Sequence, residues 1–83
     1  MQNGVRLLCF AGTRDIVGTA EMDLALPGPC TVGELMSEVC RRYPALEPHR
    51  RSIRVAVNGT YATADERIAL GDEVALIPPV AGG

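Results

Sequence analysis

The segment from residue 31 to residue 43 constrains the fold most, because its apolar residues recur at the spacing of an α-helix. One stripe along such a helix would contain Val32, Leu35, Met36, Val39, Cys40 and Tyr43. Thr31 and Glu34 have the spacing of a capping box, and Pro44 stops the helix at its other end. The pattern therefore predicts one amphipathic helix that must bury its apolar side against another element.

The other apolar segments are short and have the character of β-strands. We predict strands at residues 5–11, 20–26, 53–57, 61–62 and 74–77. The first run is almost continuously apolar, which is typical of a strand buried on both faces, whereas the second alternates between apolar and acidic residues. The connections at 12–18 and 45–52 are predicted to be irregular, and turns are predicted at 58–59 and 70–73.

The order of the predicted elements is strand, strand, helix, strand, strand, strand. It describes a mixed sheet with one main helix packed on one face. Because the first and last strands are both apolar enough to be central, we expect them to lie side by side and parallel. This is the β-grasp arrangement of the α+β class. At 83 residues the chain has room for a single domain, residues 1–83, whose core must be aliphatic because there are only one Phe and two Tyr.

The composition argues against several classes of function. A formal net charge of -2 gives no electrostatic case for binding nucleic acid or an acidic membrane surface. All 8 basic residues are arginine, so no lysine amine is present for Schiff-base chemistry. The pattern of a signal peptide and the length of a membrane span are both missing from the sequence. Cys9, Cys30 and Cys40 have no paired spacing, which favours a cytoplasmic protein with reduced thiols and no metal site.

The C-terminal segment carries the strongest functional indication. Pro78 and Pro79 favour a stiff, extended exit from the sheet. Gly82 and Gly83 have no side chains, so they can thread a narrow channel. We therefore expect residues 78–83 to form an extended tail that holds the terminal carboxylate away from the domain. The sequence offers no Ser-His-Asp or Cys-His arrangement, so no self-contained catalytic site is predicted, and whether the chain counts as an enzyme stays open.

The segment 70–83, with its Gly-Asp-Glu turn and its Pro-Pro-x-x-Gly-Gly ending, resembles the C-terminus of the small subunit of molybdopterin synthase, the MoaD family. The opening strand at 5–11 and the following Arg14, Asp15 and Gly18 are similar to the same family, as is the segment 56–58. The resemblance extends over the chain from about residue 5 onward and implies a ubiquitin-like sulfur carrier.

The resemblance also implies a chemistry for the tail. An E1-like adenylyltransferase would use ATP to adenylate the carboxylate of Gly83, and sulfur would then replace AMP to give a thiocarboxylate. This group would donate sulfur to a cyclic pyranopterin precursor during molybdenum cofactor biosynthesis, with Gly82 in the same narrow channel. The large subunit of molybdopterin synthase would be the partner, in a heterotetramer, and this chain itself would bind no cofactor.

A carrier must present its tail together with a docking face, and we expect that face beside the last strand. Its apolar part would consist of Phe10, Leu76 and Ile77, because they lie next to the exit of the tail. The competing interpretation places all three side chains in the core. The contacts with the partner would continue along the tail through Pro78, Pro79, Val80 and Ala81.

Three other functions stay open at this point. The same carrier chemistry could serve the synthesis of thiamine thiazole or of cysteine, although the Pro78-Pro79 step and the first strand favour the molybdopterin branch. A ubiquitin-like protein modifier would instead form isopeptide bonds with other proteins. The remaining alternative is a β-grasp interaction module whose tail has no chemical role.

Overall fold

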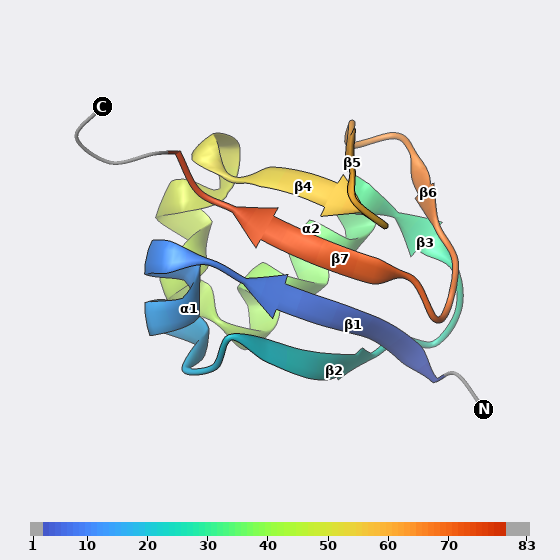
Figure 1. Ribbon diagram of the computed structural model, residues 1–83, viewed down its shortest axis with the longest axis horizontal. Coiled ribbons are helices and arrows are strands. Elements are labelled where there is room, and N and C mark those ends of the chain that lie inside the picture. The colour runs from blue at the N-terminus through green and yellow to red at the C-terminus, as the bar shows by residue number, and fades with distance from the viewer. Residues whose placement is uncertain (1–2, 80–83) are drawn as a thin grey trace.

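The computed structural model describes residues 3–79 and contains a twisted sheet with helix α2 behind it (Figure 1). The five strands lie in the order β2-β1-β7-β4-β5. Their bounds are β1 Gly4–Cys9, β2 Glu21–Ala25, β4 Arg54–Val57, β5 Thr60–Ala62 and β7 Glu73–Ile77. The terminal strands β1 and β7 are adjacent and parallel, with Leu7 opposite Val74, and the other pairs are antiparallel. The predicted β-grasp topology is confirmed.

Helix α2, Val32–Arg42, follows the predicted boundaries closely. Its capping box is formed in both directions: the Glu34 N–H donates to Thr31 Oγ1 at 3.1 Å, and the Thr31 N–H donates to Glu34 Oε1 at 2.8 Å. The helical part of the predicted apolar stripe is buried, while Tyr43 is half-buried at the C-cap. Local sequence thus determines both where this helix begins and which side it buries.

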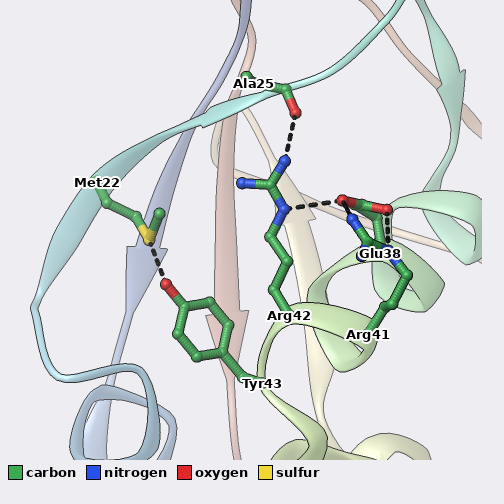
Figure 2. Close-up of polar contacts among 6 residues, drawn as sticks. All are labelled: Met22, Ala25, Glu38, Arg41, Arg42 and Tyr43. Carbon is green, nitrogen blue, oxygen red and sulfur yellow. Dashed lines mark hydrogen bonds and ion pairs between the residues drawn. The ribbon is translucent and has the colours of Figure 1, made fainter.

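The end of α2 is attached to the edge strand β2 by two side chains, which Figure 2 shows. The Tyr43 hydroxyl lies 3.4 Å from Met22 Sδ, and the Arg42 guanidinium donates to the Ala25 carbonyl at 3.3 Å. The same guanidinium pairs with Glu38 at 2.8 Å. These contacts hold the C-terminal end of α2 against the edge strand of the sheet.

The core lies between α2 and the inner face of the sheet. Its fully buried side chains are Leu7, Leu24, Leu35, Val39, Leu46, Ile68, Val74 and Leu76. Strand β1 has neighbours on both edges, as predicted, but the expectation that both of its faces are buried is wrong. Arg6 is exposed and Leu8 is only half-buried, because among residues 3–79 no second layer covers the outer face of the sheet.

The segment predicted as a loop at 12–18 is a short helix, α1, Ala11–Val17. Thr13 is buried, and its Oγ1 accepts a hydrogen bond from the Phe10 N–H at 2.9 Å and lies 3.4 Å from the Leu76 carbonyl oxygen. Gly18 ends the helix in the left-handed conformation, with φ of 94°. The flanking glycines suggested a loop, whereas contacts with the ends of β1 and β7 stabilise a helix.

Three further elements were not predicted. The connection after α2 is a 3₁₀ helix, η1, Pro44–Ser52, rather than an irregular segment. Strands β3, Cys30–Thr31, and β6, Arg67–Ile68, form a separate antiparallel pair beside the beginning of α2. The predicted Asn58-Gly59 turn is confirmed, with φ of 52° and 86°. Within residues 3–79, no helix has the length and apolarity that crossing a membrane requires.

Candidate functional site

The candidate site is the end of the sheet at which the C-terminal segment leaves the domain. Strand β7 ends at Ile77, next to the end of β1, and α1 and η1 lie at the same end (Figure 1). Pro78 is half-buried and Pro79 is exposed. The predictions that concern Val80, Ala81, Gly82 and Gly83 lie outside the described residues. What the structure describes is therefore the base of the tail and the surface around it.

An apolar groove of about 690 Å³ opens beside the base of the tail, between α1, η1 and the end of β7. We call it the tail-exit groove. Its lining residues are Phe10, Ala11, Gly12, Thr13, Ile16, Leu46, His49, Ser52, Ile53, Ile77, Pro78 and Pro79. An apolar hollow that is continuous with the base of the tail is suited to receive side chains of a protein that also holds the tail.

The three apolar residues predicted for a docking face have different surroundings. The Phe10 side chain is 48% exposed and Ile77 is half-buried, so both can contact a partner. Leu76 is 0% exposed and belongs to the core, so its side chain cannot form part of an exposed docking face. Because side chains alternate along a strand, Leu76 points inward with Val74, whereas Ile77 points outward.

Sequence reasoning missed much of the lining of the tail-exit groove. Ile16 lies on α1, in the segment that was predicted to be a loop, and His49 and Ser52 lie on η1. No periodic pattern marked either segment. The alternation within β7 could have separated Leu76 from Ile77, but only the packing of α1 and η1 brings their residues to the tail.

The three cysteines do not line the tail-exit groove, and their surroundings do not activate them as nucleophiles. Burial raises the pKa of the Cys9 and Cys30 thiols, and burial together with Glu47 raises the pKa of the Cys40 thiol. A raised pKa lowers the fraction of thiolate at neutral pH, which is the reactive form. Among residues 3–79, no group of three or more His, Cys, Asp or Glu side chains could hold a metal ion. The described geometry is that of a binding surface.

Comparisons with known proteins agree with this description. The model of the ThiS family matches residues 7–83. The molybdopterin synthase sulfur carrier subunit of Aedes aegypti is 41% identical over 86 residues, covering 95% of this chain and 88% of the relative. The protein of the same name from Arabidopsis thaliana is 32% identical, covering 95% of this chain and 82% of the relative.

Solved structures extend the similarity to three dimensions. The crystal structure of Haloferax volcanii small archaeal modifier protein 1 matches with a TM-score of 0.79 and 31% sequence identity, covering 92% of this chain and 97% of that chain. With its β-grasp topology, its tail-exit geometry and a family match over residues 7–83, the chain belongs to the ThiS family.

Proposed function

We propose that this protein is the sulfur carrier subunit of a molybdopterin synthase. The observation that carries the proposal is the 41% identity, over 95% of this chain, with a relative that bears this name. The geometry supports it, because the central strand β7 leads directly into the Pro78-Pro79 step and the Gly82-Gly83 end. In this proposal the folded domain positions the Pro78-Pro79 step, and the Gly82-Gly83 end would supply the reacting carboxylate.

The reacting group in this proposal is the carboxylate of Gly83. Attack of a carboxylate oxygen on the α-phosphorus of ATP releases pyrophosphate and forms an acyl-adenylate. Sulfide then adds to the carbonyl carbon, the C–O bond to AMP breaks, and a thiocarboxylate remains at the C-terminus. Its sulfur is a good nucleophile for transfer to a cyclic pyranopterin precursor. In this scheme ATP is bound by the activating enzyme, and the carrier itself binds no cofactor.

The tail-exit groove supports a role for protein partners. We propose that the large synthase subunit and an E1-like adenylyltransferase both dock at this end, with Phe10 and Ile77 in the contact and the tail, residues 78–83, in the partner's channel. Leu76 is left out of the docking face because it is buried. A heterotetramer of two carriers and two large subunits, located in the cytoplasm, belongs to the same proposal. The free state of all three cysteines supports that location.

Intact-mass analysis tests the proposal directly. The purified chain is incubated with an E1-like adenylyltransferase, ATP and sulfide, and its mass is compared with that of a sample lacking ATP. We expect a mass gain equal to the exchange of one oxygen for one sulfur, located by fragmentation at Gly83. Addition of the large subunit and the cyclic pyranopterin should then return the carrier to its original mass. No mass change under any of these conditions would contradict the proposal.

A protein modifier is the second candidate, and the similarity to small archaeal modifier protein 1 favours it. A modifier would appear as an isopeptide adduct of the whole chain on lysines of other proteins. Because this chain has no lysine of its own, every such adduct would be on a different protein. A carrier for thiazole or cysteine synthesis would gain sulfur in the same way, but would lose it to a different acceptor and not to the pyranopterin.

A further inference from the structure

A second groove, of about 630 Å³, lies between the beginning of α2, η1 and strands β4 and β5. It shares Ile53 with the tail-exit groove, so the two hollows flank the corner between η1 and β4. We call it the arginine groove, because Arg50, Arg51 and Arg54 line it against a single carboxylate, Glu47. Its floor is apolar and includes Val32, Met36, Ile53, Val55 and Ala62.

The arginines of this groove differ from the arginines of helix α2. Arg41 and Arg42 both pair with Glu38, at 2.6 Å and 2.8 Å, as Figure 2 shows. Among residues 3–79, no carboxylate lies within ion-pair distance of Arg50, Arg51 or Arg54. Arg41 and Arg42 thus share an internal carboxylate partner, whereas Arg50, Arg51 and Arg54 have no ion-pair partner among the described residues and are available to a ligand.

Two of the three guanidinium groups are held in place by neutral contacts. Arg50 donates to the Gly33 carbonyl and to Ser37 Oγ, both at 3.0 Å, which orients its side chain without cancelling its charge. Arg54 lies over the ring of Tyr61, 5.8 Å from the ring centroid. An oriented guanidinium loses less conformational freedom when it binds a carboxylate than a freely rotating one does. The arginines at the rim are therefore suited to bind carboxylates, and the floor is suited to contact apolar side chains.

The groove is also close to the base of the tail. Arg54 is the direct partner of Ile77 in the antiparallel pair of β4 and β7, and Pro78 follows Ile77 at once. We propose that the arginine groove binds an extended acidic segment, with alternating carboxylate and apolar side chains, of the protein partner that engages the tail. This inference rests on the proposed carrier function only for the identity of the partner. The arginine rim and the apolar floor, which would match an acidic segment, are features of the groove itself.

A binding measurement with the intact protein tests the inference. The probe is a short fluorescent peptide of alternating Glu and Leu, and a peptide of alternating Gln and Leu serves as the uncharged comparison. Fluorescence anisotropy should show binding of the Glu peptide that weakens with added salt, because the guanidinium–carboxylate contacts are screened. Arg51→Glu should weaken this binding about tenfold, since it removes a charge-assisted contact and adds repulsion.

Arg67→Glu is the matched control, because it makes the same change of charge at an exposed site on β6, outside the groove. It should leave the affinity within about twofold of the wild type. Arg54→Glu provides a second groove variant if Arg51→Glu does not fold. Amide chemical-shift changes on adding the Glu peptide should be confined to the beginning of α2, η1, β4 and β5.

Three outcomes would overturn the inference. Equal weakening by Arg51→Glu and Arg67→Glu would mean that only overall charge matters. Equal binding of the Gln peptide would mean that the arginines contribute nothing. Stronger binding of a single-stranded DNA oligonucleotide than of the Glu peptide would assign the groove to nucleic acid. None of these measurements needs ATP or an activating enzyme, so a failed thiocarboxylation leaves them interpretable, and a failed peptide titration leaves the carrier function intact.

Discussion

The two ends of the sheet are built in opposite ways. At the end away from the tail, polar groups satisfy one another: Asn58 Oδ1 accepts from the Glu73 N–H at 2.9 Å, Asn58 Nδ2 donates to Asp72 Oδ1 at 3.1 Å, and the Ala69 N–H donates to Asp72 Oδ2 at 2.8 Å. At the tail end, Phe10 is exposed beside an apolar groove. One end is closed by internal hydrogen bonds, and the other keeps apolar surface available.

This difference suggests a division of roles within one small domain, in which one end of the sheet supplies stability and the other supplies the proposed function. The closed end ties the β4–β5 turn to the start of β7, so its contacts stabilise the sheet. In the proposed carrier, the open end would supply binding surface at the base of the tail. Changes at the closed end should therefore alter the free energy of unfolding, and changes at the open end should alter transfer or binding.

The largest effect is expected from deleting Gly83. The deletion moves the carboxylate back by about 3.3–3.6 Å in an extended chain. Because a misplacement of about 1 Å can cost about a hundredfold in rate, sulfur transfer should fall below detection. Thermal unfolding should be unchanged, since Gly83 has no side chain that could pack in a core. Thiocarboxylation measured by intact mass, beside circular dichroism during heating, checks both parts. Wild-type transfer by the shortened chain would refute the role of the tail.

Gly4→Ala, at the closed end, should give the largest loss of stability. An added Cβ would lie 1.8 Å from the Leu24 carbonyl oxygen, so β1 and β2 would have to separate. The expected cost is about 1–3 kcal/mol of unfolding free energy in urea denaturation. Gly12→Ala at the open end is the control, because a Cβ there meets no atom within 4 Å. If both variants lose equal stability, the contrast between the two ends is wrong.

Phe10→Ser should weaken docking while the fold survives. The side chain is 48% exposed, so its loss removes little from the core, but it opens the edge of the tail-exit groove. We expect the affinity for the large synthase subunit to fall about tenfold in isothermal titration. Ala69→Ser, an exposed change at the closed end, should leave the affinity unchanged. A Phe10→Ser protein that binds normally but unfolds early would place this residue in the core.

Thr31→Ala should cost about 1 kcal/mol of unfolding free energy, the usual contribution of a helix N-cap. The change removes the acceptor of the Glu34 N–H at the start of α2. Thr60→Ala, at an exposed strand position, is the control. Sulfur transfer per folded molecule should be the same in both variants. A loss of transfer in Thr31→Ala at full stability would mean that the closed end also takes part in function.

The smallest effect concerns Glu38 and sharpens the contrast between the two arginine clusters. Hydrogen bonds from Arg41 and Arg42 lower the pKa of Glu38 from 4.5 to about 2. A lowered folded-state pKa stabilises the protein above pH 4.5, and this contribution is lost as pH falls toward 2. As the pH falls between these values, the free energy of unfolding measured in urea should decrease slightly less for Glu38→Gln than for the wild type. Identical pH profiles would show that the ion pairs of Glu38 with Arg41 and Arg42 add no stability.

Much of the fold could be predicted because its signals are local. The capping box at Thr31 and Glu34 and the apolar stripe of α2 depend on residues within a few positions of one another. The Asn58-Gly59 turn also depends on residues that favour positive φ. The parallel pairing of β1 and β7 followed from two apolar strands in a chain with a single long helix. The proposed role of the tail also came from sequence alone, because it rests on six consecutive residues from Pro78 to Gly83.

Only the tertiary structure decided how segments that are distant in the sequence pack against one another. It turned segment 11–17, which contains Gly12 and precedes Gly18, into helix α1, because Thr13 is buried against the ends of β1 and β7. It placed Leu76 in the core and Phe10 at the surface, although both residues are apolar. It also gathered Arg50, Arg51 and Arg54 around an apolar floor supplied by α2. Periodicity and caps act over a few residues and can be seen in the sequence, whereas burial and the meeting of side chains depend on long-range packing.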